Sequence, residues 1–258
     1  MACNAIVRLP PEREWEVKIT RTTMKKTIAL SAISAMALTG YAYSEIEADF
    51  HVGYNSTYVW RGQDLGDSAY EYGFDLAGSC ECGIDWSAGI WYINPSDNQF
   101  NDELNIYGQV SKDFGLFSVA LGFIHYEFDD TVDADNTEAY VSLGTSYSGI
   151  DFGGTFYQVV DGDLADNPSW AEFSASYSYE YSDSLGMTFG VTYGFTVDPG
   201  VDSYSTLGLR LSADYAASED ITISPYVAFN SANNFNTNSL GVDDFDGIYG
   251  GVLFAFNF

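Results

Sequence analysis

The sequence predicts an all-β protein: a transmembrane antiparallel up-and-down β-barrel of about 12 strands, with short periplasmic turns and longer acidic external loops. Three observations support this. Apolar and polar residues alternate from residue 46 onward, short and long connections alternate between the segments, and the chain ends on an alternating aromatic segment. A period of two indicates a strand with one apolar face. The first segment, residues 46–61, far exceeds the ~5–6 residues of a typical soluble strand.

Each expected strand shows this alternation to some degree. In the first, the even positions from Ile46 to Trp60 are mostly apolar, and the odd positions from Glu47 to Arg61 are mostly polar. The fifth and seventh alternate less cleanly, and a bulge near Phe123-Ile124 would explain the break in the fifth. In chain order the segments are residues 46–61, 70–77, 84–94, 103–112, 116–128, 137–147, 150–160, 170–181, 186–196, 206–216, 221–230 and 248–258.

The connections between these segments alternate in length. Short turns are expected at residues 78–83, 113–115, 148–149, 182–185 and 217–220. Longer, mostly acidic loops are expected at residues 62–69, 95–102, 129–136, 161–169, 197–205 and 231–247. Outer-membrane barrels combine short periplasmic turns with longer external loops, and an even strand count places both termini of the chain in the periplasm.

One face of the segments is apolar and aromatic, and the other carries Gly, Ser, Thr and scattered charges. A soluble sandwich would bury such an apolar face against a second sheet. Aromatic residues near the segment ends instead favour membrane-interface girdles. They are Tyr58, Trp60, Tyr70, Tyr92, Trp170, Tyr177, Tyr179 and Tyr181. Every backbone polar group in lipid must be paired, so the sheet is expected to close.

The charge balance excludes other classes of protein. The chain has 37 Asp and Glu against 9 Lys and Arg, a formal net charge of −28. Beyond residue 45, the basic side chains besides histidine are Arg61, Lys112 and Arg210. Nucleic acid is excluded as a partner because phosphates would be repelled. A helical membrane protein is also excluded, because no stretch reaches ~18 apolar residues.

Residues 24–44 are expected to be a cleaved signal peptide. Met24-Lys25-Lys26 precedes an apolar run at residues 28–38, and small residues Ala42 and Ser44 follow. A short buried helix is the alternative. Residues 1–23 contain three glutamates and two prolines and look unlike such a leader, so either Met24 is the true start or the basic region is extended. Residues 45–258 would then form the barrel in the outer membrane.

The end of the chain resembles the C-terminal signal that the β-barrel assembly machinery recognises. Apolar residues occupy every second position up to the terminal Phe, and the expected assembly signal is Val252, Phe254, Phe256 and Phe258. Besides this machinery, the partners expected are outer-membrane lipid, lipopolysaccharide, and small solutes or cations. The oligomeric state is left open.

Two motifs resemble a known family. Residues 53–62 read Gly-Tyr-Asn-Ser-Thr-Tyr-Val-Trp-Arg-Gly, and residues 122–128 read Gly-Phe-Ile-His-Tyr-Glu-Phe, followed by Thr-Glu-Ala-Tyr at 137–140. They resemble the opening strand, the aromatic strand and the Glu-x-Tyr strand start of the TorF-type porins, also called the Gcw_chp family. That family usually has Tyr-Pro where this chain has Phe128-Asp129. The resemblance implies an outer-membrane barrel regarded as a porin, without catalytic residues.

Charged residues on the polar face are candidates for lining a pore. They are Arg61, Glu71, Asp75, Asp85, Glu103, Arg210 and Asp214. If inward residues of the first hairpin face one another, Arg61 lies opposite Glu71 and Thr57 opposite Asp75. A forked Arg–carboxylate pair would then fix the hairpin register. The functional alternative is a cationic ring at a constriction.

The inward face also predicts a function. Barrels of ~8 strands fill with side chains and those of ~16 leave a channel, so about 12 strands with small inward residues predict a narrow, acidic, wet lumen. We expect a porin-like channel for passive diffusion of small solutes that prefers cations. The alternatives are a non-conducting structural barrel and an outer-membrane barrel hydrolase.

No catalytic residue, cofactor or metal site is expected. Asp-rich stretches at 129–135, 161–163 and 243–246 could bind calcium, but they lack the EF-hand order and favour a solvated rim. Cys80 and Cys82 lie in a turn, where a bond between residues two apart would be strained; free thiols or an intermolecular link are the alternatives. His125 is the one candidate for hydrolysis, and a lone His there is more often structural.

Overall fold

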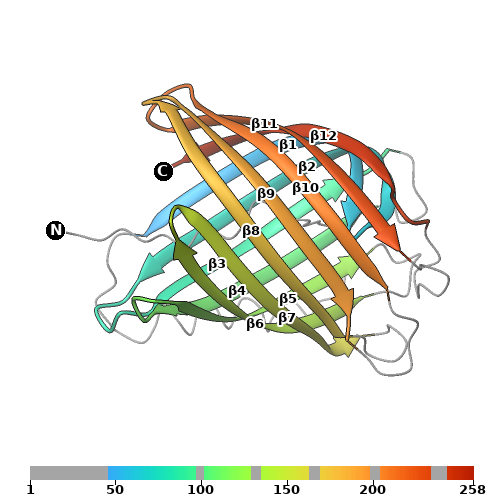
Figure 1. Ribbon diagram of the computed structural model, residues 1–258, viewed down its shortest axis with the longest axis horizontal. Helices are drawn as coiled ribbons and strands as arrows, with labels where there is room; N and C mark the ends of the chain where they lie inside the picture. The colour runs from blue at the N-terminus through green and yellow to red at the C-terminus, as the bar shows by residue number, and fades with distance from the viewer. Residues whose placement is uncertain (1–45, 97–101, 129–134, 163–168, 198–203, 234–242) are drawn as a thin grey trace.

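The computed structural model describes residues 46–96, 102–128, 135–162, 169–197, 204–233 and 243–258. These residues form a closed barrel of 12 antiparallel strands (Figure 1). The strands are β1 (Glu47–Trp60), β2 (Gln63–Ser79), β3 (Asp85–Asn94), β4 (Glu103–Asp113), β5 (Ser118–Phe128), β6 (Asn136–Tyr147), β7 (Ile150–Gly162), β8 (Ser169–Ser182), β9 (Leu185–Thr196), β10 (Ser205–Ala216), β11 (Ile221–Asn233) and β12 (Gly247–Asn257). The barrel fold predicted from the alternation is confirmed.

The two ends of the barrel differ. β1 begins and β12 ends at the same end, where Asp49 lies opposite Asn257, and their pairing closes the sheet (Figure 1). The opposite end, which carries the β1–β2 turn, is called the mouth below. The described residues contain no helix that is long and apolar enough to cross a membrane.

The outer surface of the barrel is apolar. Alternate residues of β2, Tyr70, Tyr72 and Phe74, are exposed, and so are outward residues of the other strands. These include Ile90, Leu121, Val141, Phe173, Phe189, Leu211, Val227 and Phe254. A surface of this kind is the one that lipid covers in outer-membrane barrels.

Three of the aromatics predicted for the outer girdle lie elsewhere. Tyr58 and Trp170 are each only 4% exposed. Trp170 faces Tyr157 across the β7–β8 pair, and Trp60 meets Tyr126 inside the barrel. Trp170 shares its face with the inward Glu172, since residues two apart in a strand point the same way.

The second strand starts earlier than predicted. β2 begins at Gln63, and the expected loop at 62–69 is therefore mostly strand. Arg61 and Gly62 form a two-residue turn with φ of 48° and 81°, the left-handed conformation that suits the twist of a hairpin. This corrects the register as well: Glu71 lies opposite Gly53, and Asp75 opposite Asp49. Neither Arg61–Glu71 nor Thr57–Asp75 is a pair; Thr57 instead donates a hydrogen bond to Asp67.

Other local expectations also change. β5 pairs regularly with both neighbours through Phe123, so the bulge expected there is absent. The register shifts instead within the β1–β2, β6–β7 and β8–β9 pairs. Cys80 and Cys82 form a disulfide with a Cα–Cα distance of 5.1 Å, a separation within the ordinary range. Hydrogen bonds from the Cys80 amide to the Ile84 carbonyl and from the Gly83 amide to the Cys80 carbonyl close the same turn.

Candidate functional site

The tip of the β1–β2 hairpin, residues 58–66, bends into the mouth of the barrel. Its backbone bonds to the segment before β12: the Phe245 amide donates to the Gly62 carbonyl at 2.8 Å, and the Asp64 amide donates to the Asp243 carbonyl at 3.0 Å. The β1–β2 register shifts between Tyr58 and Val59, and a bulge of this kind bends a strand.

Apolar side chains hold this tip against the inner wall. Tyr58 and Leu65 are buried together with Ile93 of β3. Trp60 meets the Tyr126 ring of β5 edge-on, with 6.0 Å between the ring centroids. Because these side chains would otherwise be exposed to water in the mouth, their burial stabilises the inward position of the tip.

Arg61 projects from the tip to the opposite wall. Its Nη1 and Nη2 atoms donate to the two carboxylate oxygens of Glu138 in β6, each at 2.8 Å. Tyr126 donates a further hydrogen bond to Glu138, at 3.2 Å, and the Tyr204 hydroxyl donates to the Arg61 carbonyl. The turn is therefore hydrogen-bonded to Glu138 of β6, to Tyr204 just before β10 and to Phe245 before β12.

Aromatic rings surround the Arg61 guanidinium. Its Cζ lies 4.6 Å from the centroid of the Trp60 ring, 4.8 Å from Tyr157 and 5.3 Å from Trp170. Burial by itself lowers the pKa of Arg61, but the charge and hydrogen bonds of Glu138, together with the nearby Tyr126 and Tyr157, outweigh it, so the pKa is raised above its ordinary value. The guanidinium therefore stays charged at the mouth.

A second polar network lies along the inner wall of the barrel. The Arg210 guanidinium of β10 lies 3.7 Å from the Tyr226 ring centroid. The Tyr226 hydroxyl donates to Asn55 Oδ1, and Asn55 is hydrogen-bonded to Glu71. The network thus connects β10 and β11 to β1 and β2 around the seam where the barrel closes.

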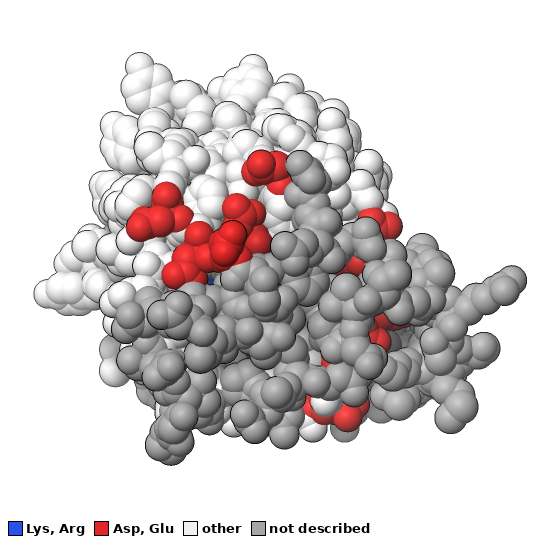
Figure 2. All heavy atoms as spheres, turned by 90° about the vertical axis from the view of Figure 1, so that its right-hand side faces the viewer, with Lys and Arg blue, Asp and Glu red and all other residues white. Residues whose placement is uncertain are grey.

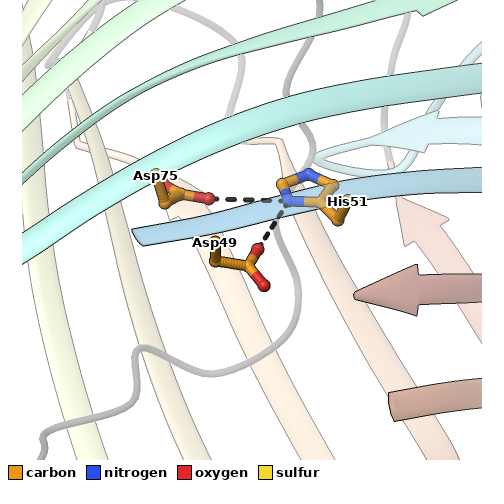
Figure 3. Close-up of side chains that lie close together, drawn as sticks. All are labelled: Asp49, His51 and Asp75. Carbon is orange, nitrogen blue, oxygen red and sulfur yellow. Dashed lines mark hydrogen bonds and ion pairs between the residues drawn. The ribbon is translucent and has the colours of Figure 1, made fainter. Parts of the chain in front are cut away.

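Three titratable side chains lie together near the end of the barrel where β1 begins and β12 ends. His51 Nδ1 is 3.2 Å from Asp49 Oδ1 and 3.6 Å from Asp75 Oδ2 (Figure 3). The Tyr107 hydroxyl of β4 donates to the other oxygen of Asp75. His51 is buried, whereas both aspartates are partly exposed to the lumen.

Inward glycines make room for these long side chains. A Cβ at Gly53 would overlap Glu71, and one at Gly73 would overlap His51. Similarly, Gly89 accommodates Tyr107, and Gly251 accommodates Tyr226. The expectation that small inward residues leave open space is therefore wrong on the side formed by β12, β1, β2, β3 and β4 (the β12–β4 side), because neighbouring side chains cover these glycines.

The wall formed by β8–β10 is different. A Cβ at Gly190 would meet no described atom within 4 Å. Its cross-strand neighbours are Ser176 and Arg210, and most other inward residues here are small and polar. They are Ser174, Ser178, Thr188, Thr192, Thr206, Gly208 and Ser212. Gly194 on the same wall is an exception, because a Cβ there would overlap Trp170. Apart from this position, the described lumen is filled on one side and bordered mostly by small residues on the other.

The predicted pore-lining residues occupy different positions. Arg61 lies at the mouth, and Glu103, only 2% exposed, lies beside the hairpin tip. Glu71 and Arg210 belong to the second polar network, and Asp75 to the histidine cluster. Near the chain ends, Asp85 is exposed, and Asp214 accepts a hydrogen bond from Ser224 at 2.6 Å.

Sequence reasoning missed several partners. Glu138, Asn55 and Tyr226 all lie on polar faces, so alternation places them inward, but it does not say which residues meet across the lumen. His125, the candidate for hydrolysis, lies 2.9 Å from Thr137 on one face of β5, whereas the adjacent Tyr126 is turned inward to Glu138. These two side chains therefore do not share a site.

Acidic side chains gather at the mouth. Figure 2 shows this end of the molecule, where Asp and Glu are prominent among the described residues in view. Exposed acids from the strand ends here are Asp67, Asp161, Asp243, Asp244 and Asp246. Of the Asp-rich stretches, residues 129–134 and 163 lie outside the described residues, and a solvated acidic rim rather than a calcium site stays the prediction for all of them.

Comparison with known proteins gives the fold. No family model matches the chain, so the resemblance to the TorF-type family is not confirmed, and no curated protein matches either. An outer-membrane channel of Pseudomonas putida is similar, with a TM-score of 0.50 and 9% identity over 86% of this chain and 98% of that one. The NanC porin has a TM-score of 0.49 and 13% identity, over 81% and 98% of the two chains. The KdgM porin has a TM-score of 0.47 and 11% identity, over 82% and 99%.

Proposed function

We propose that this protein is a porin-like channel of the outer membrane, through which small solutes diffuse passively and cations preferentially. The observation that carries the proposal is the two-sided lumen: long polar side chains fill the β12–β4 side, whereas the wall at Gly190 borders free space. A barrel of this strand number lies between those that are filled and those that conduct freely. The path proposed for solutes therefore follows the small residues of β8–β10.

The apolar outer surface supports a position in the membrane. Side chains such as Leu121, Phe173 and Phe189 are at least half exposed, and they alternate with inward polar residues. Such a surface is stable when lipid covers it. The partners proposed are therefore outer-membrane lipid and lipopolysaccharide, together with the β-barrel assembly machinery, which would read the end of β12. A cleaved signal peptide at residues 24–44 would supply the export.

The charges of the lumen support a preference for cations. Asp75 and Asp214 lie on inward faces, and the two inward arginines have other acidic neighbours. Arg61 is paired with Glu138, and the charge of Arg210 is felt by Glu71. Acidic groups along a narrow passage between low-dielectric walls concentrate counter-ions. The proposal assigns no catalytic residue and no cofactor.

Single-channel recording with cysteine substitution tests this function. The protein reconstituted in a planar bilayer is expected to conduct, and a water-soluble thiol reagent is expected to reduce the current of Gly190→Cys. Val191→Cys is the matched control, because the adjacent side chain points to lipid. Absence of current from folded protein, or equal reaction of the two variants, would contradict the proposal.

A non-conducting structural barrel is the second candidate, and the hairpin tip favours it. Tyr58, Trp60 and Arg61 occupy the mouth and are bonded to the opposite wall. The same recordings separate the two functions: a barrel that stays silent even after the Arg61–Glu138 contact is removed is structural.

A further inference from the structure

We propose that Asp49, His51 and Asp75 bind a divalent transition-metal ion, Zn²⁺ being the first choice, at the end of the lumen where the chain begins and ends. The three side chains come from inward positions of β1 and β2 (Figure 3). Their ligand atoms all lie within 4.8 Å of one another. The inference goes beyond the proposed channel and does not depend on conduction.

The spacing of the ligand atoms fits a small metal ion. In a tetrahedral zinc site with bonds of ~2.0–2.2 Å, neighbouring ligand atoms lie about 3.4 Å apart. His51 Nδ1 is 3.2 Å from Asp49 Oδ1 and 3.6 Å from Asp75 Oδ2. A hydrogen on His51 Nδ1 can be donated to only one of the two carboxylates, whereas a metal ion would bind both of them.

The pairing of the strands gives an independent reason for a cation. Asp49 and Asp75 are directly opposite each other in the β1–β2 register, and like charges in that position repel. A divalent ion between the two aspartates would replace this repulsion by attraction on both sides.

Neighbouring residues hold the ligands in place. The Tyr107 hydroxyl donates to Asp75 Oδ1, which leaves Oδ2 turned toward His51. Gly73 lies opposite His51, and any side chain there would overlap the imidazole ring. Metal sites are commonly supported by such a hydrogen bond from the surrounding shell to a carboxylate ligand.

The ligand set selects the type of metal. An imidazole nitrogen with two carboxylates suits Zn²⁺ and its first-row neighbours, whereas Ca²⁺ and Mg²⁺ prefer oxygen ligands alone. Partial exposure of both aspartates leaves room for a fourth ligand from the lumen, such as water. The histidine ligand distinguishes this cluster from the acidic rim of the mouth, where the exposed acids that the structure describes offer only carboxylate ligands.

Direct binding measurements test the site. The full protein is purified from outer membranes in detergent, without a polyhistidine tag, and stripped with EDTA. Calorimetric titration with ZnCl₂ is expected to show one ion per barrel, and CoCl₂ is expected to develop the visible absorption of tetrahedral cobalt. His51→Ala and Asp49→Asn should each weaken binding by at least about tenfold. His125→Ala, which removes the other histidine of the chain, should leave binding unchanged.

Several outcomes would overturn the site. They are no saturable Zn²⁺ binding by folded barrel, equal affinity in His51→Ala, or displacement of Zn²⁺ by equimolar Ca²⁺. Heat-modifiable gel mobility shows whether each variant folds, and the isosteric Asp49→Asn keeps the test valid if His51→Ala does not. Binding without conductance supports the site and contradicts the channel, whereas conductance without binding does the reverse.

Discussion

Arg61 and Glu138 form a forked ion pair across the mouth of the barrel, although the two residues are 77 positions apart in the sequence. The pair joins the β1–β2 turn to β6, and so it bridges walls that share no backbone hydrogen bonds. The side chain of Glu138 is only 3% exposed. The contact is therefore both a structural bond and an obstacle in the proposed path.

Removal of the arginine is expected to loosen the hairpin tip. Arg61→Ala leaves the Glu138 carboxylate buried without its partner, and losses of roughly 3–5 kcal/mol are typical for such a change. We expect a lower midpoint of urea unfolding in detergent and, in bilayers, a larger or more frequent single-channel current.

Two further variants separate these effects. Arg61→Met combined with Glu138→Leu removes both charges, and its loss of stability should be smaller than that of Arg61→Ala. Lys112→Ala is the control, because this exposed lysine lies near the opposite end of the barrel. A current that is the same in wild type and in Arg61→Ala would show that the pair does not obstruct the path.

The sequence predicts the faces of the strands better than their partners. β9 was expected at 186–196 and is found at Leu185–Thr196, because its Gly/Thr face and its aromatic face alternate without a break. β2 was expected to begin at residue 70, since Gly66 and the nearby aspartates are residues that favour turns. In the folded chain Gly66 and Asp67 pair with β1 within the hairpin tip. The tip is stabilised by its contact with Glu138 of the distant strand β6.

The site was less predictable for the same reason. Alternation alone places His51, Asp75 and Glu138 on the inward face. The β1–β2 register and the inward bend of the tip decide which of them meet, and both depend on contacts between distant strands. Gly53 and Gly73 illustrate the difficulty: small inward residues predict a wet lumen, but each of these glycines lies under a long side chain from the neighbouring strand.

Deletion of Phe258 is expected to impair assembly more than stability. Its side chain is 81% exposed, so little packing within the barrel is lost with it. A role in recognition by the assembly machinery predicts lower outer-membrane abundance and more degraded or periplasmic protein. Phe258→Tyr, which keeps an aromatic terminus, should assemble normally. Unchanged abundance of the deletion variant on immunoblots of outer-membrane fractions would contradict a signal at this residue.

N-terminal sequencing should locate the processing site. If residues 24–44 are a signal peptide, protein isolated from outer membranes begins at Glu45, one residue before the first described position. Ala42→Lys, which places a large charge at a position that needs a small residue, should lead to accumulation of the precursor. Recovery of residues 24–44 in the mature outer-membrane protein would refute the assignment.

Ion selectivity is expected to depend on acids inside the lumen rather than on those at the mouth. Under a KCl gradient, the reversal potential should have the sign for K⁺ over Cl⁻, because lumenal carboxylates concentrate cations. Asp75→Asn with Asp214→Asn should reduce this potential, whereas Asp67→Asn with Asp244→Asn should change it little at high salt. The difference follows from screening: exposed charges act over ~10 Å at about 0.1 M salt and only ~3 Å at about 1 M, while charges within a narrow passage are screened less. EDTA in both chambers removes any metal ion from Asp75, so the comparison reports the carboxylates alone. Preference for anions in the wild-type protein, or equal effects of the two double variants at high salt, would reject the cation-preferring channel.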